Sequence, residues 1–118
     1  MDTVLAEPCE LDALIRESCN PQQPVIGWLG QAGFLIRWRA LQLAIDPYLS
    51  DSLAAKYRGT AFPHVRLLPP PIAPDRLTSL DVVLCTHAHT DHMDPETLAR
   101  IAAASPRCRV ARNRAPGQ

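Results

Sequence analysis

Three of the four histidines fall within nine consecutive residues, THAHTDHMD at positions 86–94. His87 and His89 are two residues apart, so in extended backbone their side chains point the same way and can reach one ion. Asp91 and His92 follow where the chain turns, and they can face a second point nearby. Imidazoles combined with a carboxylate suit zinc, manganese or iron better than calcium. The spacing therefore predicts that His87, His89, Asp91 and His92 bind a divalent metal.

The alternative is a polar surface loop beside a helix, in which Thr86 and Asp94 make ordinary turn contacts. A single histidine would favour that alternative, whereas three histidines and an aspartate at a strand-to-helix junction favour metal binding. Asp46 ends a run that could form a neighbouring strand. We expect its carboxylate to accept a hydrogen bond from the N–H of a ligand imidazole, because metal-bound histidines are commonly oriented in this way.

A weaker set of candidates lies in the proline-rich stretch between the strands. His64 and Arg58, with Arg66 nearby, could line a substrate pocket and bind an anionic group such as phosphate. The competing interpretation is a rigid, polyproline-like excursion whose charges are solvated. Cys85 directly precedes the histidine motif, and we expect it to be a small buried hydrophobe and not a nucleophile.

Apolar patterning predicts the strands that must position these residues. Runs rich in β-branched and aromatic residues, separated by turn residues, predict strands at 25–29, 34–38 and 41–45. The nearly continuous apolar run at 81–85 is typical of a strand buried on both faces. Both tryptophans of the chain lie in the predicted strands, and we expect Trp28 and Trp38 to be core or half-buried strand residues.

Helix signals surround these strands. Asp94 is followed by a proline and a glutamate, which predicts an N-cap, an N1 proline and a helix over 97–104. Helical spacing of apolar residues predicts an amphipathic helix over 9–19, and a short helix is expected at 50–57. A last strand is expected at 107–111. The order of elements indicates a layered α/β (α+β) arrangement.

Composition limits the classes of function. The 118 residues carry 12 basic and 12 acidic side chains, so the net charge does not attract nucleic acid or anionic membranes. The four cysteines are scattered without a C-x-x-C pair, and the first residues lack the basic and apolar regions of a signal peptide. We therefore expect a cytoplasmic protein with reduced thiols, a small-molecule substrate, and neither a nucleic-acid nor a membrane partner.

The motif T-H-x-H-x-D-H after a buried apolar strand resembles the signature of the metallo-β-lactamase superfamily. The stretches WLGQAGFLIR (28–37), IDPYLSDS (45–52) and HVRLLPPPI (64–72) resemble one branch of it, which contains L-ascorbate-6-phosphate lactonase. The resemblance covers roughly residues 25–106. It implies an αββα sandwich, with His87 and His89 on a first metal and Asp91 and His92 on a second.

The resemblance also implies a function and a missing part. It implies a hydrolase that acts on a lactone, ester or phosphorylated small molecule through a metal-activated water, with Asp91 as a catalytic residue that orients the water or handles its proton. Members of the superfamily complete the two-metal site with a second half, whereas no histidine follows His92 here. We therefore expect an N-terminal half, whose open sheet face self-associates or binds a missing C-terminal half; the alternative is a catalytically inactive metal-binding or interaction module.

The expected organisation has three parts. Residues 1–24 form a helix and linker, residues 25–111 form the partial metallo-β-lactamase domain, and residues 112–118 form a disordered tail.

Overall fold

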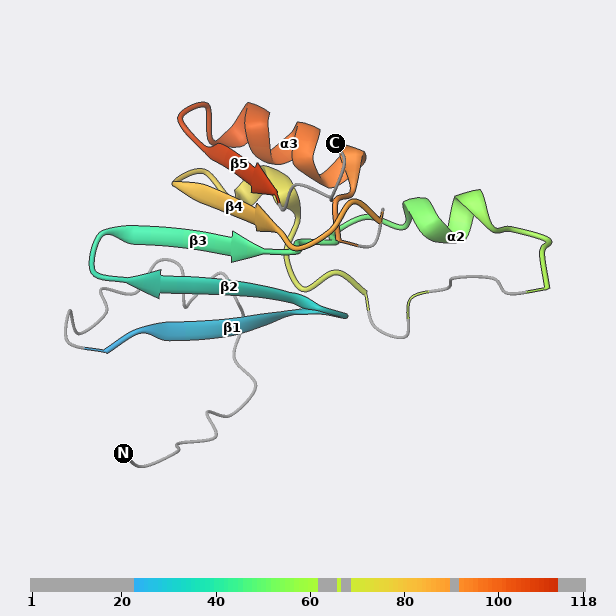
Figure 1. The fold of residues 1–118 in the computed structure, drawn as a ribbon, viewed down its shortest axis with the longest axis horizontal. Coiled ribbons are helices and arrows are strands. Elements are labelled where there is room, and N and C mark those ends of the chain that lie inside the picture. Colours follow the sequence, from blue (N-terminus) through green and yellow to red (C-terminus); the bar gives the residue numbers. More distant parts are fainter. Residues whose placement is uncertain (1–22, 62–65, 67–68, 90–91, 113–118) are drawn as a thin grey trace, which may run out of the picture.

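The computed structural model describes residues 23–61, 66, 69–89 and 92–112. These residues form one five-stranded mixed sheet with helices (Figure 1), which confirms the expected α+β class. The predicted helix over 9–19 lies outside the described residues. The elements are β1 (Val25–Gly30), β2 (Gly33–Trp38), β3 (Leu41–Ile45), α2 (Ser52–Lys56), the 3-10 helix η1 (Pro74–Arg76), β4 (Val82–Cys85), α3 (Pro95–Ala104) and β5 (Arg109–Arg112).

The first three strands form an antiparallel meander, in the order of the chain. The turn between β1 and β2 needs left-handed backbone at Gly30 (φ 91°) and Gln31 (φ 50°), and Arg39 (φ 57°) serves the next turn. A glycine tolerates this region without a Cβ clash, which explains its use at the first of these positions. The meander therefore follows from the turn residues that separate the apolar runs.

The last two strands run parallel to β3. β4 pairs with β3 and with β5, and α3 connects β4 to β5. Parallel strands that are neighbours end at the same edge of a sheet, so the segments that follow β3 and β4 lie side by side. β5 extends to Arg112, the residue at which the tail was expected to begin.

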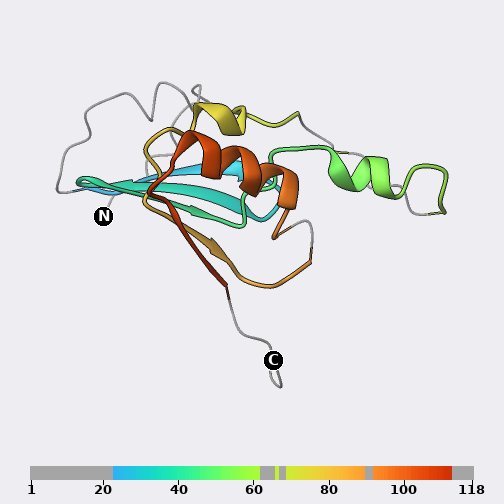
Figure 2. The ribbon, with the colours of Figure 1, turned by 90° about the horizontal axis from the view of Figure 1, so that it is seen from above.

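One face of the sheet forms the hydrophobic core with the helices. Figure 2 shows η1 and α3 on the same side of the sheet. The fully buried side chains of this layer include Ala44 and Val83 from the sheet and Ile101 from α3. The rest of the cluster consists of Leu29, Leu35, Leu49, Ile72, Leu77, Leu80 and Cys85.

The opposite face of the sheet is open to solvent. Trp28 is 53% exposed, Trp38 is 43% exposed and Leu84 is 37% exposed. The prediction that the strand at 81–85 is buried on both faces is therefore wrong. Both tryptophans are half-buried strand residues, which is one of the two environments expected for them, and neither lies in the core. The apolar pattern is present, but no described element covers this side, because both η1 and α3 pack on the other.

Helix α3 begins as the sequence predicts. The Asp94 carboxylate accepts hydrogen bonds from the backbone N–H groups of Glu96 and Thr97, and Pro95 occupies the first turn. These contacts satisfy donors that have no partner inside the helix, and the negative charge suits the helix N-terminus. No helix within the described residues is long and apolar enough to cross a membrane.

Candidate metal centre

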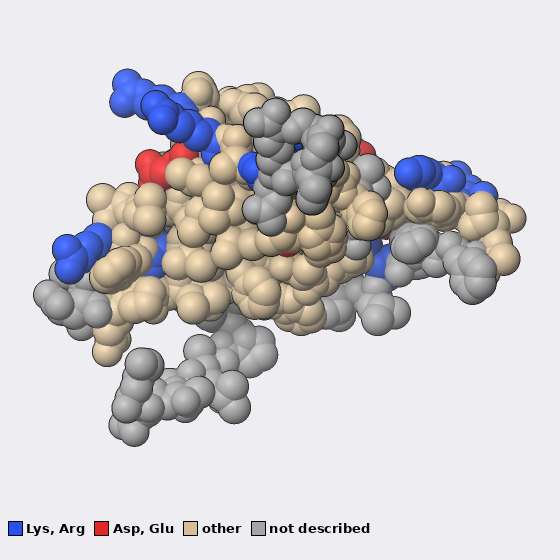
Figure 3. Space-filling view, viewed as in Figure 1, with Lys and Arg blue, Asp and Glu red and all other residues tan. Residues whose placement is uncertain are grey.

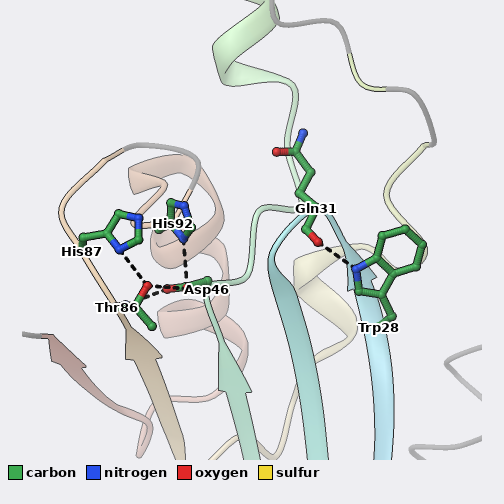
Figure 4. Close-up of polar contacts among 6 residues, drawn as sticks. All are labelled: Trp28, Gln31, Asp46, Thr86, His87 and His92. Atoms are coloured by element: carbon green, nitrogen blue, oxygen red, sulfur yellow. Dashed lines mark hydrogen bonds and ion pairs between the residues drawn. The ribbon is translucent and has the colours of Figure 1, made fainter.

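The candidate residues follow the ends of two parallel neighbours, β3 and β4 (Figure 4). Asp46 comes directly after β3, and Thr86 and His87 come directly after β4. The Asp46 N–H donates to the carbonyl of Leu84 at 2.9 Å, which continues the backbone hydrogen bonds between β3 and β4 beyond the end of β3. The sheet edge therefore brings together residues that are 40 positions apart in the chain.

Asp46 is the most constrained residue of this edge. It is 3% exposed and has a positive φ of 46°, a conformation that is uncommon for residues other than glycine. Its carboxylate accepts from the Thr86 N–H and the Thr86 hydroxyl, both at 2.7 Å. Burial raises the pKa of Asp46, but hydrogen bonds from Thr86 and His92 outweigh it, and the net pKa lies below the usual value. The surroundings therefore hold this carboxylate in its charged form.

The hydrogen bonds of Asp46 and Thr86 fix the tautomers of two imidazoles. Nδ1 of His92 lies 3.0 Å from the Asp46 carboxylate, so this nitrogen carries the proton and donates. Nδ1 of His87 lies 2.9 Å from the Thr86 hydroxyl oxygen. Because the single hydroxyl proton of Thr86 is donated to Asp46, that oxygen accepts from His87 Nδ1–H. In both rings the lone pair for a metal is thus on Nε2.

The imidazoles lie close together. The ring centroids of His87 and His92 are 3.7 Å apart, and those of His87 and His89 are 5.5 Å apart with perpendicular planes. The backbone N–H of His92 donates to the His89 carbonyl at 2.9 Å, which curls the loop back and brings the third ring near the other two. Neutral rings tolerate this spacing better than two cations would, and neutral imidazole is the form that binds metals.

The remaining candidates are not part of this cluster as described. Asp91 and His64 lie outside the described residues, so their predicted roles stay predictions. Arg58 is exposed beyond the end of α2. In the part of the chain that the structure describes, no contact joins it to the histidines.

The donor chemistry fits a divalent ion, although the described set is partial. Two neighbouring Nε2 lone pairs and a third imidazole are ligands that zinc and manganese accept. Among residues 23–61, 66, 69–89 and 92–112, no three His, Cys, Asp or Glu side chains are arranged to hold an ion as they stand. The fold therefore orients His87 and His92 so that Nε2 of each ring can bind a metal ion. Asp91 lies outside the described residues.

The β1–β2 hairpin borders the same edge of the sheet. A Cβ on Gly33 would lie 2.8 Å from the Asp46 carbonyl oxygen, so the hairpin approaches Asp46 as closely as only a glycine permits. Trp28 Nε1 donates to the Gln31 carbonyl at 2.8 Å, which holds the indole beside the turn (Figure 4). The glycines in the sequence are consistent with a turn here, but they do not predict that Gly33 contacts Asp46.

A second polar cluster ties the segment after β3 to the start of α3. The buried Asp94 carboxylate accepts from the hydroxyls of Ser50 at 2.6 Å and Ser52 at 2.9 Å. The Leu49 N–H donates to the Thr97 hydroxyl at 3.0 Å. The sequence identified Asp94 as a helix cap only, because nothing in the pattern showed that residues 44 positions away would share its carboxylate.

Arg66 binds backbone carbonyls of the segment that follows β3. Its Nη1 donates to the carbonyls of Tyr48 at 2.6 Å and Ser50 at 3.3 Å. Its guanidinium carbon lies 4.9 Å from the centre of the Tyr48 ring, within the range of a cation–π contact. The competing interpretation, in which the charges of this stretch are merely solvated, is wrong for Arg66, because the guanidinium donates to carbonyls of the segment that follows β3.

Cys85 is buried, as the sequence predicts, at 2% exposure. Burial raises the pKa of its thiol, and the nearby Asp46 charge raises it further. A thiol is nucleophilic as the thiolate, so this environment suits a packing role.

Comparisons with known proteins agree with this geometry. The chain is 33% identical over 79 residues to N-acyl-phosphatidylethanolamine-hydrolyzing phospholipase D 1 of Caenorhabditis elegans, covering 67% of this chain and 21% of that protein. The crystal structure of isothiocyanate hydrolase from Delia radicum gut bacteria superposes with a TM-score of 0.52 at 28% identity, covering 66% of this chain and 30% of that one. The chain thus spans between about a fifth and a third of the length of these relatives.

The family described as "Beta-lactamase superfamily domain" matches residues 25–113. The match includes all five strands, Asp46 and the whole histidine motif. The chain therefore belongs to the beta-lactamase superfamily and carries its hydrolase-like domain.

Proposed function

We propose that this chain carries the metal-binding part of a hydrolase, with His87, His89, Asp91 and His92 as ligands of zinc or manganese. One observation carries the proposal. Hydrogen bonds from Nδ1 of His87 and His92 leave Nε2 as the lone-pair nitrogen in two rings whose centroids are 3.7 Å apart. Histidines that bind metals usually donate their second ring N–H to a carboxylate or another fixed acceptor, and both rings do so here.

The residues of the chain divide the work. Asp46 orients the His92 imidazole directly, and the Thr86 hydroxyl, itself bonded to Asp46, orients that of His87, so Nε2 of each ring is left to bind a metal. The histidines would hold a divalent ion, which would supply Lewis-acid chemistry to polarise the scissile bond and acidify a water. Asp91 is proposed to orient that water and take its proton.

The proposed substrate is a lactone, an ester or a phosphorylated small molecule. The named relatives are hydrolases, one of a phospholipid and one of isothiocyanates. Residues 28–37, 45–52 and 64–72 support placement near the lactonase branch by their resemblance alone. Arg58 and His64 remain proposed contacts for an anionic group of the substrate.

A second candidate is a metal-binding module without turnover. It is favoured by the number of candidate ligands, because His87, His89, Asp91 and His92 are too few to hold two ions by themselves. The two candidates share the metal and differ only in catalysis.

The deciding experiment measures metal-dependent hydrolysis by the purified chain. The chain is stripped with a chelator, reloaded with zinc or manganese, and assayed on lactones, carboxylic esters and phosphate esters. His89→Ala is compared with Asp75→Asn, an exposed change in η1 that lies away from the histidines. Turnover that needs metal and is lost only in His89→Ala supports the hydrolase; metal binding without turnover supports the second candidate; absence of metal binding refutes both.

A further inference from the structure

The chain that follows β3 is buried although it forms neither a strand nor a helix. Residues 46–50, which we call the buried segment, are all buried and run irregularly from Asp46 to Ser50. Buried backbone groups outside regular structure need hydrogen-bond partners, because an unpaired one has lost its contact with water. Asp46 is the first residue of this segment, so the contacts that fix the segment also fix the carboxylate that orients His92.

The buried segment makes hydrogen bonds to three parts of the fold. Its N–H groups at Asp46 and Leu49 donate to β4 and α3. Its carbonyls at Tyr48 and Ser50 accept from Nη1 of Arg66, at 2.6 Å and 3.3 Å. The guanidinium carbon also lies 4.9 Å from the centre of the Tyr48 ring. Two neighbouring elements thus hold N–H groups of the segment, and one arginine from a distant stretch holds two of its carbonyls.

The β1–β2 turn packs against this arrangement at two points. A Cβ on Gly30 would lie 2.9 Å from Nη2 of Arg66, and one on Gly33 would lie 2.8 Å from the Asp46 carbonyl oxygen. Both approaches are too close for a residue with a side chain. The two glycines therefore let the turn confine the arginine and the first residue of the buried segment together.

The surroundings of Arg66 use the shape of its guanidinium. In Figure 3, Lys and Arg side chains reach into solvent at the ends of the molecule, for example where α2 lies. Arg66 is instead partly buried and donates to backbone carbonyls. A guanidinium carries five donors in a fixed planar fork, so it can bind neighbouring carbonyls and stack on a ring at once.

The orientation of His92 depends on a small displacement of Asp46. Asp46 has a positive φ of 46°, and a backbone conformation of this kind persists where the surroundings hold it in place. Its carboxylate lies 3.0 Å from Nδ1 of His92. Because such hydrogen bonds span about 2.7–3.2 Å, a shift of about 0.5 Å would weaken this contact markedly.

We propose that Arg66 is a positioning residue of the metal centre. By fixing the buried segment at Tyr48 and Ser50, it keeps the Asp46 carboxylate aimed at Nδ1 of His92. This role differs from the contact with an anionic substrate group that the sequence suggested. The inference rests on the proposed function for its effect on metal binding, whereas the orientation of His92 can be measured without a metal.

The tautomer of His92 in the metal-free chain is the most direct readout. Nitrogen-15 NMR at mildly alkaline pH, where imidazole is neutral, distinguishes a proton on Nδ1 from one on Nε2. We expect the Nδ1–H form in the unchanged chain and a mixture of both forms in Arg66→Met, which removes the donors but keeps a long side chain. Arg100→Met is the matched control, because Arg100 binds Asp75 in η1.

Zinc affinity is the second readout, measured by calorimetry on the same proteins. We expect at least about a 3-fold loss in Arg66→Met and no change in Arg100→Met. The loss should be smaller than the about 10–100-fold cost of removing the partner of a ligand histidine itself. A cation that acted through its charge alone would repel the ion, so its removal would raise the affinity.

Gly30→Ala tests the contact between the turn and the arginine. The added Cβ strains the turn by itself, since φ is 91°, and also displaces Arg66. We expect it to shift the His92 tautomer in the unchanged chain and to add nothing in the Arg66→Met background, because the two changes share one contact. Circular dichroism verifies that each variant folds. If Arg66→Met does not fold, Arg66→Lys takes its place and is compared with Arg100→Lys, since lysine keeps the charge but lacks the planar fork.

The outcomes separate this role from the proposed function. A His92 tautomer that changes with Arg66 but not with Arg100, together with weaker zinc binding, supports the positioning role. An unchanged tautomer in the folded Arg66 variant overturns it, and so does a rise in zinc affinity or an Nε2–H form in the unchanged chain. If the unchanged chain binds no zinc, the proposed function fails, and the tautomer of the metal-free chain still decides the role of Arg66.

Discussion

At the scale of single residues, the histidine motif depends on two side chains outside it. The Thr86 hydroxyl donates to Asp46 and accepts from His87, while Asp46 accepts from His92. One buried carboxylate thus orients two imidazoles, one of them through a threonine. Sequence spacing predicted the ligands and also pointed to Asp46 as a hydrogen-bond acceptor for one of them. Thr86 was assigned only to turn contacts, because its role depends on the pairing of β3 with β4.

Replacement of Asp46 by asparagine tests the carboxylate. Asn has the same shape but no charge, so it is a weaker acceptor for the N–H groups of Thr86 and His92. We expect the affinity for zinc to fall about 10–100-fold, the usual cost of losing a partner behind a ligand histidine. Competition with a chromophoric chelator measures this affinity. An unchanged affinity in a folded Asp46→Asn protein contradicts the assignment.

Replacement of Thr86 separates the hydroxyl from the methyl group. Thr86→Val keeps the size and the backbone N–H bond to Asp46 but removes the hydroxyl's hydrogen bonds to Asp46 and His87, whereas Thr86→Ser keeps the hydroxyl. We expect zinc affinity to fall at least about 10-fold in the valine variant and to change little in the serine variant. Equal affinities in the two variants would show that the hydroxyl does not set the tautomer of His87.

At the scale of elements, helix α3 is attached to the rest of the fold at two points. Asp94 ties the helix start to the segment that follows β3, and Arg100 forms a bidentate pair with Asp75 of η1 at 2.8 Å for both contacts. The cap itself could be predicted, since Asp-Pro-Glu is a local signal. The serine partners of Asp94 could not, because they depend on long-range packing.

Removal of the Asp94 carboxylate tests the first attachment. Asp94→Ala removes the cap and leaves the buried hydroxyl of Ser50 without its acceptor, so the free energy of unfolding should fall by about 2–4 kcal/mol. Ser52→Ala removes one partly buried hydrogen bond and should cost about 1 kcal/mol. Urea unfolding measures both values. Equal losses would mean that Asp94 acts as an ordinary cap.

The second attachment predicts a pH dependence. The hydrogen-bonded Arg100 guanidinium holds the pKa of Asp75 below its usual value of 3.8. The folded chain therefore favours the carboxylate, so the pair stabilises the fold above pH 3.8 and this contribution is lost as the pH falls through the lowered pKa. Because both side chains are exposed, the effect is small.

Thermal unfolding of Asp75→Asn measures this contribution. The variant should melt slightly below the unchanged chain at neutral pH, and the difference should disappear in strong acid. A difference that persists or grows in acid would mean that Asp75 stabilises the fold by something other than its charge.

At the scale of the whole molecule, the sequence predicted the strands but not their surroundings. Turn residues and apolar runs marked β1 to β5 closely, since both signals are local. The exposure of Trp28 and Trp38 could not be read from the pattern, because an apolar strand face looks the same whether or not a second layer covers it.

The central claim is that the histidine loop binds a divalent metal through imidazoles oriented by Asp46. Zinc titration by calorimetry, on the stripped chain and on His87→Ala, His89→Ala, His92→Ala and Asp75→Asn, tests it most directly. We predict saturable binding to the unchanged chain and to Asp75→Asn, and a loss of affinity of at least about 10-fold in each histidine variant. Equal zinc binding by all five proteins would contradict the account.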